Sequence, residues 1–170
     1  MNYTSSEAAK LLRKLNEDLE AAYAKERASK TFLASIGEDV ESVRPEYDFK
    51  AARENIAEIQ KKIRIVKHAL NIFNTTTVLP EFDITIDEAL VLIPQLSREK
   101  STLSDMKNTI PKTRATVAGY GRTSAVIDYR YANYSIDEAS EEYAKVCEKL
   151  DKLQTALDLI NSTCEIEIAA

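Results

Sequence analysis

The stretch that decides the fold runs from Phe49 to Phe73 and reads FKAARENIAEIQKKIRIVKHALNIF. Apolar residues recur in it at two interleaved seven-residue spacings, and nearly every residue between them is polar or charged. The eight apolar positions are Phe49, Ala52, Ile56, Ile59, Ile63, Val66, Leu70 and Phe73. A seam of this kind, sustained for about four heptads, is typical of a coiled coil. We therefore expect a long helix that packs against another helix along this seam.

A second heptad helix is predicted over residues 135–161, where Ser135 and Glu138 form a capping box. Its seam consists of Ile136, Ala139, Tyr143, Val146, Leu150, Leu153, Leu157 and Ile160. Seven acidic residues against three lysines give this helix a net charge of -4. The stretch from Asp48 to Phe73 has six Lys or Arg residues against three acidic ones, a net charge of +3. Because flanking charges select helix partners, we expect these two helices to adjoin, within one chain or between chains.

The first helix is expected to begin at Thr4, which forms a capping box with Glu7, and to continue to about Ser35. Its apolar face is interrupted by Glu26 and Ser29, so its middle should pack loosely or meet a polar partner. A loop of about ten residues then leads to the Phe49 helix, and so short a connection implies an antiparallel helical hairpin over residues 4–73. A further helix is expected over 85–110, with a kink at its internal proline, Pro94.

Residues 113–134 show the two-residue alternation of strands instead. Ile127, Tyr129 and Tyr131 alternate with charged residues, and the Tyr120–Arg122 segment has the composition of a turn. This pattern predicts a β-hairpin. The tail, residues 164–168, also alternates, which leaves two interpretations open: a short strand added to this hairpin, or a disordered tail.

Two helix starts resemble each other: TIDEA at residues 85–89 and SIDEA at 135–139. Either both converge on a good helix start, or they record a duplication at a spacing of about fifty residues.

The 170 residues and the scarcity of glycine and proline suit one mostly helical domain over residues 1–170. The predicted fold class is mainly all-α: an antiparallel bundle of four long, coiled-coil helices, with a small β-hairpin between the third and the fourth. The N-terminal residues lack the basic and apolar regions of a signal peptide, and cysteines are few, so we expect a cytoplasmic protein.

Residues suited to catalysis are scarce. The single histidine, His68, falls at the most exposed heptad position, and Cys147 and Cys164 match no zinc or disulfide spacing. The acidic cluster from Glu81 to Glu88 lacks the ligand pattern of a calcium loop. We therefore expect a protein that is not an enzyme and has no metal or cofactor.

Basic and aromatic residues alternate between Lys107 and Tyr134, an arrangement that can bind single-stranded nucleic acid. The net charge of the chain is -5, however, and tyrosine is common in strands. The balance does not favour nucleic acid as a partner.

Two stretches resemble a small family of bacterial helical proteins that includes septicolysin. One reads LNIFNTTT at residues 70–77 and continues through an acidic loop to ITIDEAL at 84–90. The other runs from Tyr129 through the Ser135 helix to LINSTCEI at residues 159–166, where Ser162 and Cys164 depart from the family's aromatic and threonine residues. The resemblance implies an all-helical subunit with long antiparallel hairpins, assembly into an oligomer and an association with pore formation. Against a pore, the apolar stripes are committed to helix packing, so the sequence does not decide whether a membrane is a partner.

The expected function is a non-catalytic structural or interaction role for a homo-oligomer, with an unidentified protein as a further partner. One alternative is a septicolysin-like pore-forming protein, and another is a prefoldin-like holdase, because that family also places a β-hairpin between two heptad helices. The predicted interface residues are Glu26, Ser29, Phe49, Ile56, Ile63, Leu70, Tyr120, Arg122, Tyr129 and Tyr131.

Overall fold

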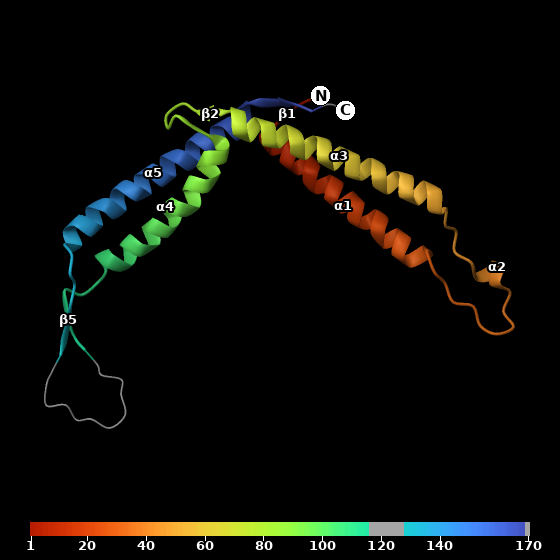
Figure 1. The fold of residues 1–170 in the computed structure, drawn as a ribbon, viewed down its shortest axis with the longest axis horizontal. Coiled ribbons are helices and arrows are strands. Elements are labelled where there is room, and N and C mark those ends of the chain that lie inside the picture. The colour runs from red at the N-terminus through yellow and green to blue at the C-terminus, as the bar shows by residue number, and fades with distance from the viewer. Residues whose placement is uncertain (116–127, 169–170) are drawn as a thin grey trace, which may run out of the picture. The chain divides into compact units, whose positions relative to one another are not determined.

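A computed structural model describes residues 1–115 and 128–168 of the chain. They form two compact units, each of which is described by itself (Figure 1). The first comprises Met1–Val78 with Asp158–Ala170, and the second comprises Leu79–Leu157. The fold is mainly helical, as predicted. The bundle of four helices is not confirmed, because each unit on its own contains one pair of long helices.

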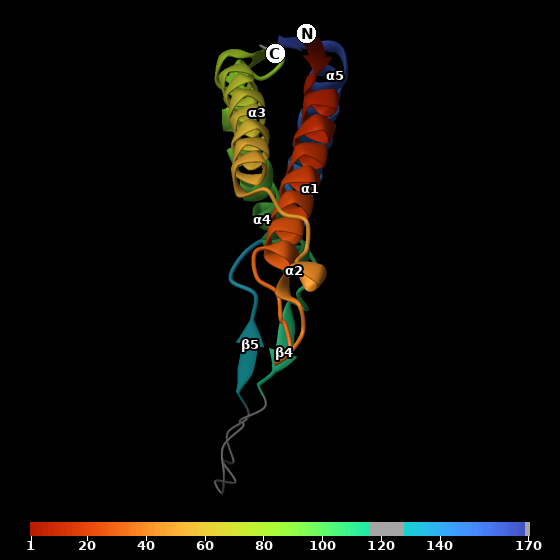
Figure 2. The same cartoon turned by 90° about the vertical axis from the view of Figure 1, so that its right-hand side faces the viewer.

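In the first unit, α1 (Ser5–Ser29) and α3 (Phe49–Thr76) lie side by side as an antiparallel hairpin (Figures 1 and 2). Their seam is closed by buried residues: Ala8, Leu15, Ile56, Ile63, Val66 and Phe73. The connection between them holds a single helical turn, α2 (Val40–Val43), which the sequence did not predict.

The chain ends meet in the same unit. Strand β1 (Asn2–Thr4) pairs antiparallel with β6 (Glu165–Glu167), with Tyr3 opposite Ile166. The main chains of Met1 and Ile168 extend this ladder through two further hydrogen bonds of 3.1 and 3.0 Å. The predicted strand in the tail therefore exists, but its partner is β1 and not the hairpin of residues 113–134.

In the second unit, α4 (Ile86–Lys107) runs beside α5 (Ile136–Thr163), as Figure 1 shows. The buried residues again follow the heptad positions: Ile86, Ala89, Leu96, Ala139, Val146, Leu150, Leu153 and Leu157. The Tyr134 hydroxyl donates to the Met106 carbonyl at 2.9 Å, and Lys107 Nζ lies 3.5 Å from the centre of the Tyr143 ring.

Two short strand pairs complete the fold. Strand β2 (Val78–Leu79) pairs with β3 (Ile84–Thr85), and β4 (Lys112–Arg114) pairs antiparallel with β5 (Tyr129–Tyr131). The second pair confirms the two outer strands of the hairpin predicted over 113–134, whose turn lies outside the described residues.

Helix boundaries depart most from prediction in α1, which ends at Ser29 and not near Ser35. The periodic residues Leu33 and Ile36 lie beyond the helix and are fully exposed. Because α3 begins only at Phe49, where Asp48 caps it, a longer α1 would have no partner for these side chains. The other long helices differ from prediction by three residues or fewer at each end, and α4 continues through Pro94.

The order of elements occurs twice along the chain: strand, helix, connection, helix, strand. The first helices of the two halves align as TSSEAAKLLRKL at residues 4–15 and TIDEALVLIPQL at 85–96. The second helices, α3 and α5, have 28 residues each and end as ALNIFNTT at 69–76 and ALDLINST at 156–163.

This agreement of element order, helix length and sequence indicates a tandem duplication of one helical hairpin. Thr85 corresponds to Thr4, and Ser135 corresponds to Asp48, which caps α3 as Ser135 caps α5. Thr85 and Ser135, whose helix starts resemble each other at a spacing of about fifty residues, begin different helices of the hairpin.

The two equivalent capping boxes have the same geometry. The amide of Glu7 donates to Thr4 Oγ1 at 3.2 Å and the amide of Thr4 donates to Glu7 Oε2 at 2.9 Å. Thr85 and Glu88 repeat these bonds at 3.2 and 2.7 Å. Hydrogen bonds from the threonine amide, and then from its hydroxyl, lower the pKa of each glutamate below its usual value.

The seam of α3 is tested by two matched substitutions in the same helix. Ile56→Ala removes a side chain that is 1% exposed, and Ile72→Ala removes one that is 49% exposed. We expect Ile56→Ala to lower the free energy of unfolding by about 2–5 kcal/mol, because it leaves a cavity, and Ile72→Ala to change it by less than about 1 kcal/mol. Urea unfolding followed by circular dichroism measures both, and equal effects would contradict the observed seam.

The capping boxes predict an acid-dependent loss of stability. A carboxyl group whose pKa is lower in the folded protein stabilises the fold above its unfolded pKa, and this contribution disappears as the pH falls through the folded pKa. Glu7→Gln with Glu88→Gln keeps a side-chain acceptor at each capping box but removes the carboxyl group that gains a proton as the pH falls. We expect melting temperature to fall less between about pH 5 and 3 in this variant than in the unmodified protein. Glu17→Gln with Glu20→Gln, elsewhere on α1, is the control and should follow the unmodified protein.

Candidate functional site: the tip of the first hairpin

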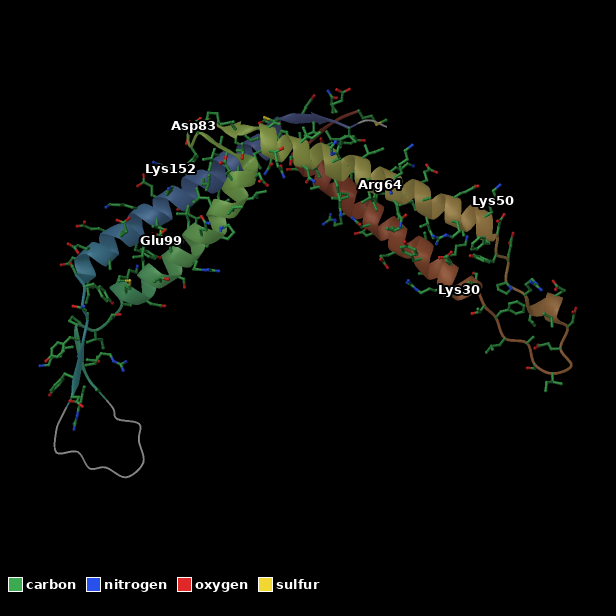
Figure 3. All side chains as sticks on the ribbon, viewed as in Figure 1. Lys30, Lys50, Arg64, Asp83, Glu99 and Lys152 are labelled. Carbon is green, nitrogen blue, oxygen red and sulfur yellow. The ribbon has the colours of Figure 1, made fainter. Side chains whose placement is uncertain are left out.

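The connection between α1 and α3, residues 30–48, forms the end of the first helical hairpin, and we call it the hairpin tip. It leaves α1 at Lys30, and α3 begins just before Lys50 (Figure 3). Gly37 has a φ of 90°, a left-handed conformation that other residues rarely adopt, and Pro45 favours extended chain before it.

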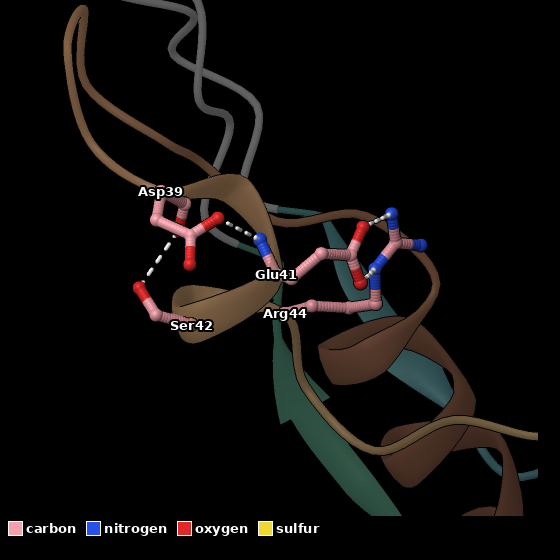
Figure 4. A network of polar contacts seen from close by, with 4 residues as sticks. All are labelled: Asp39, Glu41, Ser42 and Arg44. Carbon is pink, nitrogen blue, oxygen red and sulfur yellow. Dashed lines mark hydrogen bonds and ion pairs between the residues drawn. The ribbon is translucent and has the colours of Figure 1, made fainter.

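Polar contacts order the middle of the hairpin tip (Figure 4). Asp39 caps α2: its Oδ1 accepts from the Glu41 amide at 3.2 Å, and its carbonyl accepts from Ser42 Oγ at 2.7 Å. Arg44 donates to both carboxylate oxygens of Glu41, at 2.9 and 2.7 Å, and its guanidinium lies 5.3 Å from the centre of the Phe32 ring. The backbone conformation of the tip is therefore supported by its own residues.

Apolar side chains of this ordered tip face solvent. Leu33 is 96% exposed and Ile36 is fully exposed, and Val40 and the adjoining Phe49 are also exposed. Around them the tip is acidic, with five carboxylates against Lys30 and Arg44, a net charge of -3 over residues 30–48. The surface thus combines apolar contact area with negative charge.

A cavity of about 510 Å³ lies at the base of the tip, between α1 and α3. Its walls are small or polar residues: Ala22, Lys25, Glu26, Glu46, Tyr47, Asp48, Ala51, Ala52 and Asn55. Ala22 and Ala52 occupy seam positions, and their short side chains leave the space open between the helices. The loose packing predicted for this part of α1 is therefore present.

Glu26 interrupts the seam and has polar partners. Its side chain is only 16% exposed; Oε2 lies 3.5 Å from Arg53 Nη1, and Oε1 accepts from the Tyr47 hydroxyl at 3.3 Å. Partial burial first, and then the negative charge of Glu26 and this hydrogen bond, raise the pKa of Tyr47. A tyrosine hydroxyl is protonated at neutral pH even at its ordinary pKa, so Tyr47 is the donor of this hydrogen bond. Ser29, also predicted to interrupt the seam, is half-buried at the end of α1.

The other predicted interface residues separate into several groups. Ile56 and Ile63 are buried and Leu70 is half-buried on the seam of the first unit, so Ile56 and Ile63 belong to a core and offer no surface to another chain. Phe49 is exposed beside the tip. Tyr120 and Arg122 lie outside the described residues.

Tyr129 and Tyr131 belong to the ribbon of β4 and β5, which we call the aromatic ribbon (Figure 2). Both are exposed, with ring centres 6.5 Å apart. Lys112, opposite Tyr131 in the register, places Nζ 4.3 and 5.4 Å from the centres of the two rings. Arg114 lies opposite Tyr129, and side chains directly opposite each other share one face of a ribbon. That face is therefore aromatic and basic.

Within residues 1–115 and 128–168, no group of three or more His, Cys, Asp or Glu side chains is placed to hold a metal ion. In the same residues, no helix has the length and apolar character needed to cross a membrane. His68 is exposed on α3. The tip and the aromatic ribbon expose apolar side chains and charged residues to solvent.

Comparison with known proteins gives a fold and no function. No family model matches the chain, and no curated protein matches it. The structure is similar to the crystal structure of a functionally unknown conserved protein from Corynebacterium diphtheriae, with 14% sequence identity and a TM-score of 0.60. The match covers 98% of this chain and 100% of that one, so the fold extends to a distant bacterial protein.

The break in the seam gives a direct test of this site. Glu26→Leu would continue the heptad pattern, fill part of the cavity and leave Arg53, which is half-exposed, in water. We expect this change to raise the free energy of unfolding by about 1 kcal/mol through added apolar burial. Glu20→Leu, at an exposed position of the same helix, should leave it nearly unchanged. A loss of stability in Glu26→Leu would mean that the carboxylate contributes more to the hairpin than an apolar contact does.

Proposed function

We propose that the protein is a non-catalytic interaction protein that acts through the ends of its helical hairpins and assembles with further copies of itself. The observation that carries this proposal is the exposure of Leu33 and Ile36 on a tip whose backbone is ordered by its own hydrogen bonds. Exposed apolar side chains gathered in one short segment are typical of a surface that another molecule covers.

The cost of the arrangement supports an interaction role. An apolar side chain in water contributes nothing to hydrophobic burial, and its neighbours on a loop are normally polar. Here Asp39, Glu41 and Arg44 fix the conformation around Val40, and the bond from the Ser35 amide to Glu38 Oε2 at 2.9 Å holds the turn that contains Ile36. A segment ordered in this way loses little conformational entropy on binding, which favours affinity.

The chemistry of the cavity supports binding over catalysis. Glu26 is held by Arg53 and by the hydrogen bond that the Tyr47 hydroxyl donates. A general base needs an unshared acceptor within reach of a nucleophile, and this carboxylate already accepts from its neighbours. We further propose that the setting is a reducing one such as the cytoplasm, because Cys147 and Cys164 are free thiols.

The septicolysin-like resemblance is compatible with assembly into an oligomer. The net charge of -3 on the tip opposes contact with anionic phospholipid headgroups. Membrane contact is therefore not the role that we propose for the tip.

The proposed assembly is tested by solution mass. Light scattering after size exclusion, at two protein concentrations and at low and high salt, should give a mass that exceeds 19.1 kDa and rises with concentration. High salt should reduce it, because charged tips contribute to the contact. A mass of 19.1 kDa under all conditions would contradict the self-association and would leave the exposed tip to an apolar client, as in a prefoldin-like holdase.

A further inference from the structure

We propose that the hairpin tip of one chain binds the aromatic ribbon of a second copy. The inference rests on the proposed function and names the two surfaces that would meet. It begins from the duplication: the tip and the ribbon occupy equivalent places, each between the two long helices of its hairpin. The two segments differ in the sign of their charge: the tip is acidic and the ribbon is basic.

The charges of the two surfaces are complementary. Residues 30–48 have a net charge of -3. The described part of the ribbon carries Lys112, Arg114 and Arg130 against a single carboxylate, Asp128. Complementary potentials of this kind steer two surfaces together and fix which pair of surfaces meets.

The apolar parts also match. Tyr131 is 61% exposed and Tyr129 is exposed beside it, on the same face as two cations. The tip presents Leu33 and Ile36, with the cavity below them lined by the carboxylates of Glu26, Glu46 and Asp48. Aromatic side chains bring a large apolar area at a small entropic cost, and tyrosine and arginine are the residues that most often dominate protein interfaces. Lys25 also lines the cavity and Glu26 is already paired with Arg53, so Glu46 and Asp48 are the carboxylates that the cavity offers to a basic side chain.

The same charges select against the other candidate occupants of the tip. A nucleic acid or an anionic vesicle presents phosphates, which the carboxylates of the tip repel. A second copy of the chain presents both an apolar ring face and positive charge. Because the two surfaces differ, the contact is heterologous, so each added chain leaves one free tip and one free ribbon. The assembly therefore grows with concentration or closes into a ring.

Charge reversal on each surface tests this contact. The tip variant is Glu38→Lys with Glu46→Lys, which leaves the capping residues Asp39 and Asp48 intact and removes one bond of the tip, from the Ser35 amide to Glu38 Oε2 at 2.9 Å. The ribbon variant is Lys112→Glu with Arg114→Glu. We expect each variant alone to associate about tenfold more weakly than the unmodified chain, measured by sedimentation at several concentrations. An equimolar mixture should recover most of the affinity, because both tip–ribbon contacts in the mixture again join opposite charges.

A control separates this contact from general charge effects. Glu17→Lys with Glu20→Lys reverses the same number of carboxylates on the exposed face of α1 and should leave association unchanged. Circular dichroism of every variant establishes that it is folded. Unchanged association of both variants, or a mixture no stronger than its components, would overturn the inference while the proposed self-association stands. A monomeric unmodified chain would overturn the proposed self-association itself.

Discussion

The structure depends on one interaction, the apolar seam between two long antiparallel helices. A helix with a single apolar stripe can cover that stripe with one partner: α3 packs against α1, and the buried residues of α4 and α5 follow the same heptad spacing. Such a pair buries a narrow core and leaves most of each helix surface in water. The ends of the hairpins are then free to carry other chemistry. The pairing of β1 with β6, which joins the two ends of the chain, adds Ile166 and Ile168 to the buried residues of the first unit.

Duplication explains why this interaction occurs twice. A helical hairpin with a capping box at its start and an ALxxxNxT helix end is present in each half of the chain, in the same order and with second helices of equal length. Two of the strand pairs follow the same rule, since β1–β6 and β2–β3 each join the first strand of one half to the last strand of the other. What the copies do not share is the segment between their helices: a loop with α2 in the first, and the β4–β5 ribbon in the second.

The sequence predicts the parts of this fold that local chemistry determines. Heptad spacing identifies the α3 and α5 helices and nearly all of their buried residues, and Thr4, Thr85 and Ser135 are found as caps because capping depends on neighbours only. It fails where a distant partner decides. Leu33 and Ile36 continue the period of α1, but no residue of α3 lies opposite them. The alternation of the tail indicates a strand, whereas its partner β1 has only three residues and no such signal. For the site, the break at Glu26 is visible in the sequence, while the exposure of Leu33 follows only from where α1 ends.

Glu26 and Lys107 bring the seam and the hairpin ends together. When TSSEA of the first copy is aligned with TIDEA of the second, Glu26 and Lys107 fall at the same position of the first helix. Glu26 lies in the last turn of α1, and Lys107 is the last residue of α4. Both are charged residues on a seam where an apolar residue would pack better, and each is held from the facing helix, Glu26 by Arg53 and Lys107 by the ring of Tyr143. Their signs match the surfaces that they adjoin, negative beside the acidic tip and positive beside the basic ribbon. A purely structural role would favour leucine at both positions. Charged residues of opposite sign at these two positions give one hairpin end a negative charge and the other a positive charge. We therefore argue that binding by the ends depends on this difference in charge.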